Sequence, residues 1–123
     1  MTVSGFTQVL STFNANASRM AISSITLAEL LHGAEKSIRV SDNLSVIEDF
    51  CSRLEVLPYG AKAAQHYGAI RAALGKLGQP IGVNDLLIAG HARSEGLVLA
   101  TNNTSEFACV SALELENWVH FGR

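Results

Sequence analysis

Short apolar segments alternate with helix-length amphipathic segments along most of the chain, and this alternation restricts the fold more than any other feature of the sequence. Residues 20–25, 55–57 and 97–101 have the length and apolar character of buried strands. Between them, apolar residues recur every three or four positions, as on one face of a helix. Strands that alternate with helices form a parallel sheet covered on both faces. We therefore predict an α/β fold, a three-layer α/β/α sandwich with a parallel sheet.

Helix boundaries are predicted from this periodicity and from capping and breaking residues. Thr26 and Glu29 have the spacing of a capping box, so Thr26 is the expected N-cap of the helix after the first strand. Gly78-Gln79-Pro80 ends a later helix, and Gly96 closes the one that Asn84 or Asp85 opens. The predicted helices are residues 6–13, 27–38, 42–54, 61–77 and 86–94, and a last edge strand is predicted at residues 118–121.

Length and composition exclude several classes of protein. A chain of 123 residues can bury a core of its own, and 48% apolar with 16% charged residues excludes a disordered tail. No apolar run approaches the roughly 18 residues of a membrane span. Cys51 and Cys109 lack metal-binding spacing and are expected to be reduced thiols. We expect one domain, residues 1–123, in the cytoplasm and not on a membrane.

Charge is unevenly distributed along the chain although the net charge is only −2. Residues 51–93 carry five basic residues and two acidic ones, whereas residues 94–123 carry one basic residue and four acidic ones. Solvated helix faces explain such a pattern. It is also compatible with a polyanion that lies along one side of the molecule.

Polar residues that suit a metal site fall near the ends of two predicted strands. Glu29 lies in the first helical turn after one strand, and Asp85 opens the helix before the other. Three more polar residues directly follow that second strand: Asn102, Asn103 and Glu106. Sites in open α/β sheets form at the carboxyl ends of strands, and carboxylate and amide oxygens suit Mg²⁺ or Mn²⁺. Capping of helix amides is the alternative role for each carboxylate.

Other combinations of reactive residues are weaker. Glu29 and His32 are three residues apart, but no second histidine follows at zinc-site spacing. His66 and His91 lie on predicted helices without partners, so structural or exposed roles are favoured. The glycines match no phosphate-binding loop.

Three segments together resemble a known family. They are Ile22-Ser23-Ser24-Ile25-Thr26-Leu27-Ala28-Glu29-Leu30 with Gly33 and Ala34, Val83-Asn84-Asp85-Leu86-Leu87-Ile88-Ala89-Gly90-His91-Ala92, and Leu97-Val98-Leu99-Ala100-Thr101-Asn102-Asn103 with Glu106-Phe107. In order and spacing they resemble PIN-domain proteins, in particular the VapC-type toxins of bacterial toxin–antitoxin pairs. Trp118 fits the closing strand of that family, and the resemblance covers roughly residues 7–119.

The resemblance implies metal-dependent cleavage of RNA phosphodiesters, with Mg²⁺ or Mn²⁺ as cofactor. Glu29 matches the second acidic position of the family and Asp85 the third. Asn103 matches the fourth position, where many members have Asp and some have Asn, and Thr101 matches the hydroxyl residue beside it. RNA is then the expected substrate, an antitoxin-like protein the expected partner, and a homo-oligomer, most simply a dimer, the expected assembly.

The amino-terminal region departs from the family pattern. Members begin with a strand that ends in Asp-Thr-Asn or a similar sequence, lies in the middle of the sheet and supplies a principal metal ligand. Residues 1–18 contain no acidic, basic or histidine residue, so we expect a fold truncated at the amino end with an incomplete acidic site. Two hypotheses follow: a VapC-like endoribonuclease with weak activity, or an inactive PIN remnant that acts as a protein-binding or oligomerisation module.

Overall fold

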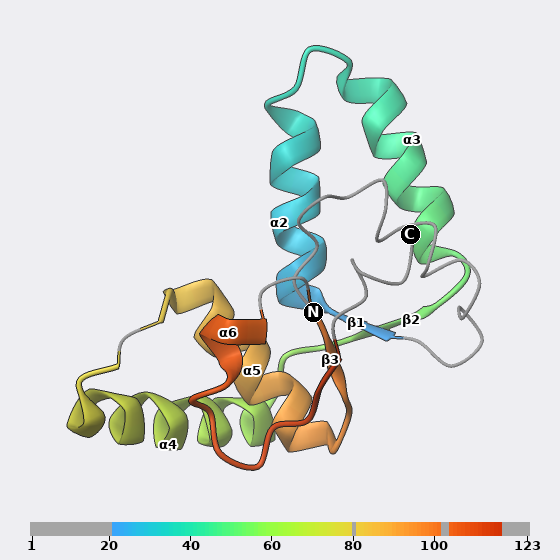
Figure 1. Cartoon of the computed structure of the whole chain (residues 1–123). Coiled ribbons are helices and arrows are strands. Elements are labelled where there is room, and N and C mark those ends of the chain that lie inside the picture. The colour runs from blue at the N-terminus through green and yellow to red at the C-terminus, as the bar shows by residue number, and fades with distance from the viewer. Residues whose placement is uncertain (1–20, 80, 102–103, 117–123) are drawn as a thin grey trace.

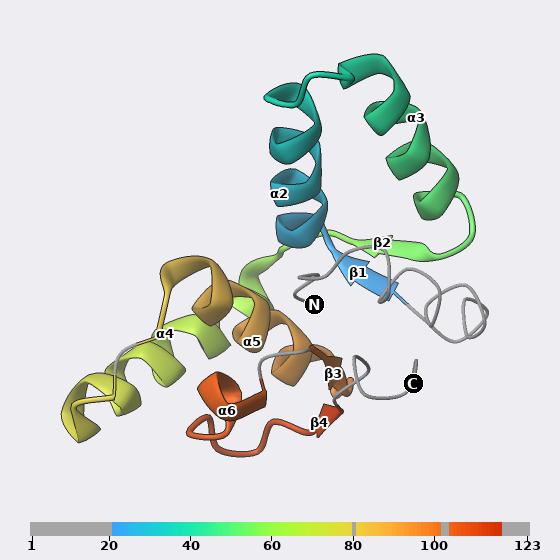
Figure 2. The ribbon, with the colours of Figure 1, turned by 45° about the horizontal axis from the view of Figure 1, so that its top comes forward.

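The computed structural model describes residues 21–79, 81–101 and 104–116. Its elements are β1 (Ala21–Ser23), α2 (Ser24–Glu35), α3 (Val40–Cys51), β2 (Glu55–Leu57), α4 (Ala61–Leu77), α5 (Val83–Glu95), β3 (Leu99–Ala100), α6 (Thr104–Phe107) and β4 (Leu115–Glu116). Each of the first three strands is followed by one or two helices, which confirms the predicted alternation (Figure 1). The hairpin of α2 and α3 stands over β1 and β2, whereas α4, α5 and α6 surround the β3 region (Figure 2).

The described strands form two parallel pairs. β1 pairs with β2 in the register Ile22 to Val56, and β3 pairs with β4 in the register Leu99 to Leu115. The parallel direction agrees with the prediction. Within the described residues, however, no ladder joins the two pairs, so the expected sheet is not continuous in this part of the chain.

Buried apolar side chains form two clusters that hold the strand pairs together. The larger cluster lies among α4, α5, β3 and α6, and its buried members are Ile70, Leu74, Leu86, Ile88, Ala89, Leu99, Phe107 and Val110. The smaller joins Ile22 of β1, Phe50 of α3 and Ala100 of β3. Because Ile22 and Ala100 share one cluster, both strand pairs contribute to a common core although their ladders are separate.

The packing of α4 against α5 depends on one glycine. A Cβ at Gly90 would lie 2.9 Å from the backbone nitrogen of Tyr67 and 3.2 Å from the carbonyl oxygen of Ala63, closer than ordinary contacts allow. Glycine therefore permits the backbones of the two helices to approach. Both helices end as predicted, at Gly78 and Gly96, which adopt left-handed conformations with φ of +67° and +66°.

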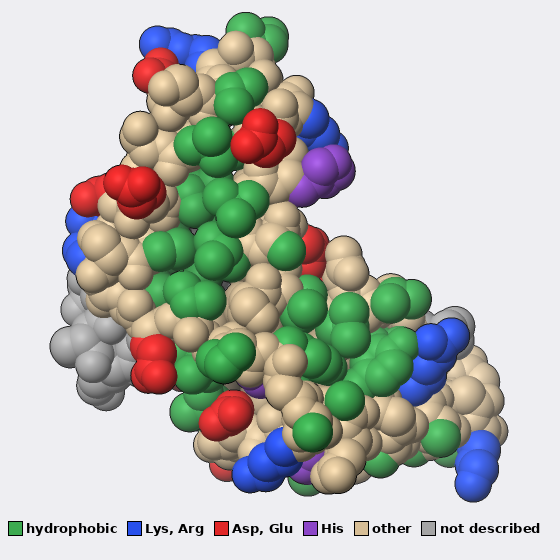
Figure 3. Space-filling model, turned by 180° about the vertical axis from the view of Figure 1, so that it is seen from behind, with side chains coloured by type: hydrophobic (Ala, Val, Ile, Leu, Met, Phe, Trp, Pro, Cys, Tyr) green, Lys and Arg blue, Asp and Glu red, His purple; other side chains and the backbone are tan. Residues whose placement is uncertain are grey.

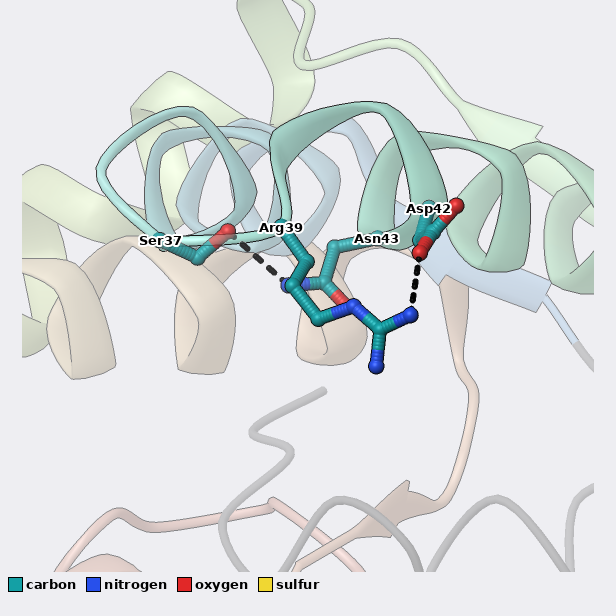
Figure 4. A network of polar contacts seen from close by, with 4 residues as sticks. All are labelled: Ser37, Arg39, Asp42 and Asn43. Atoms are coloured by element: carbon teal, nitrogen blue, oxygen red, sulfur yellow. Dashed lines mark hydrogen bonds and ion pairs between the residues drawn. The ribbon is translucent and has the colours of Figure 1, made fainter.

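The turn between α2 and α3 is held by local polar contacts (Figure 4). Ser37 Oγ donates to the carbonyl oxygen of Ala34 at 2.6 Å and accepts from Asn43 Nδ2 at 2.8 Å. Arg39 forms an exposed ion pair with Asp42, 3.0 Å between Nη2 and Oδ2. Between the two helices lies an open cavity of about 230 Å³, lined mostly by apolar side chains. Figure 3 shows hydrophobic side chains gathered in a strip over the upper half of the molecule, which the hairpin forms.

The start of α2 corrects the predicted cap. Ser23, not Thr26, is the N-cap, because its hydroxyl accepts a hydrogen bond from the Ile25 N–H at 3.1 Å. Thr26 is buried in the first turn. Serine and threonine are both good N-cap residues, and the tertiary contact of Ser23 with His91 favours the earlier one.

The boundaries of the hairpin were predicted too far along the chain. α2 ends at Glu35, so Ile38 lies beyond the helix and is fully exposed instead of on its apolar face. α3 runs from Val40 to Cys51 and not from residue 42 to 54. The polar turn described above ends α2 early, and it allows α3 to begin before the expected residue.

Differences also occur near the candidate site, whereas α4 has the predicted boundaries. α5 begins at Val83 with Gly82 as N-cap, which places Asp85 inside the first turn and not at the cap. Of residues 97–101 only Leu99 and Ala100 form β3, because only these two residues pair with β4. The short strand β4 was not predicted, and the predictions at residues 6–13 and 118–121 lie outside the described residues. Among the described helices, none is both long and apolar enough to cross a membrane.

Candidate active site

Two carboxylates lie at the amino-terminal end of α5. Asp85 is half-buried in the first helical turn, and its Oδ2 lies 4.0 Å from the position that a Cβ on Gly82 would take. Glu106, on α6, accepts a hydrogen bond from the Gly82 N–H through Oε1 at 3.4 Å. Both carboxyl groups thus meet at Gly82, although 21 residues separate them in the sequence.

The local sequence explains how α5 and α6 present these groups. Gly82 is the N-cap of α5 and has no side chain, so its amide is open to a carboxylate from another element. The positive end of the helix dipole also favours negative charge at this place. Both residues were among the polar groups that the sequence offered for a metal site, and Asp85 was also matched to an acidic position of the family.

The other predicted site residues are not all brought to this place. Glu29 lies on α2, and its side chain is exposed. Among residues 21–79, 81–101 and 104–116, no three His, Cys, Asp or Glu side chains form a group that could hold a metal ion. Asn103 lies outside the described residues. The structure therefore brings together Asp85 and Glu106 but does not add Glu29 to them.

Thr101 follows β3 at the carboxyl end of the strand and is buried. Its backbone N–H donates to the carbonyl oxygen of Glu116 at 3.0 Å, one of the hydrogen bonds that join β3 to β4. The position is that expected of the hydroxyl residue beside a site, because in parallel sheets the carboxyl ends of strands carry the functional loops.

A buried polar contact connects α5 with β1. His91 Nδ1 and Ser23 Oγ lie 2.7 Å apart in a hydrogen bond, and the ring of Tyr59 packs edge-on against the imidazole with centroids 5.0 Å apart. Burial lowers the pKa of His91, and the nearby charge of Glu95 opposes that effect only in part. His91 is therefore a neutral structural residue, one of the two roles favoured from the sequence.

Comparison with known proteins assigns the family. The family model for the PIN domain matches residues 6–112 of this chain. The chain belongs to the PIN-domain family. It is 57% identical over 112 residues to ribonuclease VapC2 of Haemophilus influenzae, a match that covers 91% of this chain and 85% of that protein. It is 56% identical over 106 residues to the tRNA(fMet)-specific endonuclease VapC of Shigella flexneri, covering 86% of this chain and 80% of that protein.

Solved structures agree with this assignment. The crystal structure of DNA-bound VapBC from Salmonella typhimurium matches with a TM-score of 0.84 and 53% identity, over 90% of this chain and 84% of that one. VapBC2 from Rickettsia felis, bound to a DNA fragment from its promoter, matches with a TM-score of 0.82 and 44% identity, over 88% and 83% of the two chains. The predicted resemblance to VapC-type PIN domains and the predicted α/β fold are thereby confirmed.

Ribonucleases with PIN domains generally use divalent metal ions. The donor set at the start of α5 fits such an ion, because Mg²⁺ retains several waters and needs only one or two protein carboxylates. Asp85 and Glu106 supply two carboxylates beside Gly82.

Proposed function

We propose that this PIN domain is a metal-dependent endoribonuclease of VapC type, with Mg²⁺ or Mn²⁺ as cofactor. The observation that carries the proposal is that the carboxylates of Asp85 and Glu106, from two separate helices, both lie beside Gly82 at the start of α5. The high identity to proteins named as ribonucleases supports it. The hypothesis of an inactive binding module is not favoured by these relatives.

Each acidic residue has a defined role in this proposal. Asp85 and Glu106 hold the cation at the start of α5. Glu29 and Asn103 stay ligand candidates from the family pattern alone, since Glu29 is exposed on α2 and Asn103 lies outside the described residues. When bound, the cation stabilises negative charge that develops on the scissile phosphate. The amino terminus of α5 adds a positive potential on the same side, which favours a phosphate near Asp85.

The substrate class proposed is tRNA, because a relative with 56% identity is named a tRNA(fMet)-specific endonuclease. An antitoxin protein is the proposed partner, because the similar solved structures are VapBC complexes. We place RNA, antitoxin and this chain in the cytoplasm. We further propose that the chain forms a homo-oligomer, which light scattering of the purified protein would test.

The experiment is single-turnover cleavage of initiator tRNA in Mn²⁺, with the natural chain compared with Asp85→Asn and Glu106→Gln. We expect each substitution to reduce the cleavage rate by at least tenfold, because each removes one carboxylate charge from the cation. Asp42→Asn is the matched control, since Asp42 is an exposed carboxylate in the first turn of α3 whose ion pair within the described residues is with Arg39. Unchanged cleavage in both site variants would contradict the proposed site, and no cleavage by the natural chain would contradict the proposed activity.

A further inference from the structure

One helix of the molecule carries basic side chains without any acidic one. α4 contains Lys62, Arg71 and Lys76 in its 17 residues and no Asp or Glu, whereas α2 and α3 contain five carboxylates and no Lys or Arg. On the face shown in Figure 3, basic side chains lie around the α4 part of the molecule, one of them beside a histidine. α4 therefore contributes basic side chains to the basic segment of residues 51–93 noted in the sequence.

Within the basic region, Arg93 of α5 contacts a face of α4 that carries His66 and Lys62. Lys62 and His66 are four residues apart on α4 and so share one face of the helix. Arg93 Nε, on α5, donates to His66 Nδ1 at 2.9 Å, and Arg93 Nη1 donates to the carbonyl oxygen of Ser111 at 3.1 Å. Because Nδ1 of His66 accepts this bond, the ring proton lies on Nε2, which makes His66 a donor as well.

The charges of this cluster are not neutralised by neighbours in the described part of the chain. Arg39 and Arg53 pair there with Asp42 and Asp49, at 3.0 and 3.1 Å. Lys62 and Arg93 form no ion pair with any described residue, and the two bonds made by Arg93 hold its guanidinium in place. A fixed guanidinium loses less rotational freedom when it binds an anion than a free side chain does.

We propose that Lys62, His66 and Arg93 bind backbone phosphates of RNA outside the cleavage site. The inference rests on the proposed ribonuclease function, and it names a second contact that the substrate makes. Asp85 and Arg93 are eight residues apart on α5, about 12 Å along the helix axis. An RNA strand at the amino terminus of α5 therefore reaches the cluster within a few nucleotides.

The test is equilibrium binding of fluorescently labelled initiator tRNA in EDTA at several salt concentrations, where cleavage cannot occur. Lys62→Gln should weaken binding about fivefold at 0.1 M salt and reduce the slope of log K against log salt by about 0.7–1, since one phosphate contact is lost. Arg93→Lys keeps the charge but loses the two bonds that fix it, and should weaken binding less. Thermal unfolding of each variant verifies that it is folded.

Two controls remove the same charge elsewhere. Arg53→Gln removes a cation that Asp49 already neutralises, and Arg71→Gln removes a cation on the other flank of α4, where its guanidinium contacts Tyr67. If the affinity for tRNA falls in Lys62→Gln but in neither control, the result supports phosphate binding by the cluster. Binding that falls equally in Arg71→Gln and Lys62→Gln, or that is unchanged in Lys62→Gln, overturns it.

A single-stranded DNA of matched length identifies the source of the phosphates. Weaker binding of the DNA than of RNA supports RNA as the ligand, and tighter binding of the DNA overturns it. Because EDTA removes the metal, a loss of binding in Lys62→Gln can be found even if cleavage by the natural chain fails.

Discussion

Replacement of Gly90 by alanine tests the contact between α4 and α5. The new Cβ would lie 2.9 Å from Tyr67 N, 3.0 Å from Tyr67 Cα and 3.2 Å from the oxygen of Ala63, whereas ordinary contacts fall between 3.4 and 4 Å. All three neighbours are backbone atoms, so no side-chain rotation can relieve the overlap and the helices must separate. Overpacking of this kind costs about 1–3 kcal/mol.

The helix itself gains from the same substitution, because alanine is a better helix former than glycine by about 0.5–1 kcal/mol. The net expectation for Gly90→Ala is a loss of about 0–2.5 kcal/mol in the free energy of unfolding, where an open helical site would gain stability. For a chain of this length, each kcal/mol lowers the melting temperature by roughly 3–6 °C.

Gly68→Ala is the matched control, since Gly68 lies within α4, is exposed, and has nothing within 4 Å of the position of a new Cβ. The same chemical change should there raise stability by about 0.5–1 kcal/mol. Urea denaturation followed by circular dichroism measures both variants. If Gly90→Ala were as stable as Gly68→Ala, the close approach of the two helices would be refuted.

Two further predictions concern the contact between Ser23 and His91. Ser23→Ala removes the N-cap of α2 and leaves His91 Nδ1 without its partner. Urea denaturation should therefore show a loss of about 2–3 kcal/mol in the free energy of unfolding. The control Ser45→Ala, on the exposed side of α3, should show almost no loss. Burial lowers the pKa of His91, so the unfolded chain takes up its proton first as the pH falls. The contribution of His91 to stability should therefore be complete above about pH 6.5 and decline below it. Between pH 8 and pH 5.5, the free energy of unfolding should fall less in His91→Gln than in the natural chain. Equal falls in the two proteins would contradict the assigned role of His91.

The regular parts of the fold could be predicted because local signals determine them. α4 begins and ends at the predicted residues, since its apolar periodicity stops at Gly78-Gln79-Pro80 and Gly78 adopts the left-handed conformation. Ser23 and Thr26 are both suitable caps, and only the distant His91 distinguishes them. β3 and β4 have two residues each, too few for a pattern of alternation.

Of the candidate site, the sequence offered both Asp85 and Glu106 as metal-site candidates but did not show that these two lie beside the same glycine. Glu106 comes to Asp85 only because α6 folds back to the Gly82 amide, a tertiary contact without local signal. Gly90 did have a signal, since a glycine within a helical segment often marks a close approach of two backbones. Glu29 matched the family pattern in sequence. A match in sequence does not determine where the side chain lies, and in this structure the side chain of Glu29 is exposed on α2.

Residues at the beginning, in the middle and at the end of α5 connect the candidate site to the rest of the molecule. Its first turn carries Asp85, its middle contacts α4 through Gly90 and β1 through His91, and its last turn carries Arg93. A substitution in the middle of α5 would therefore move the carboxylate and the basic cluster together, and would reduce both cleavage and RNA binding through the fold alone. Selective loss of cleavage in Asp85→Asn with unchanged RNA binding, and loss of binding in Lys62→Gln with unchanged stability, are the results that a purely structural effect cannot produce.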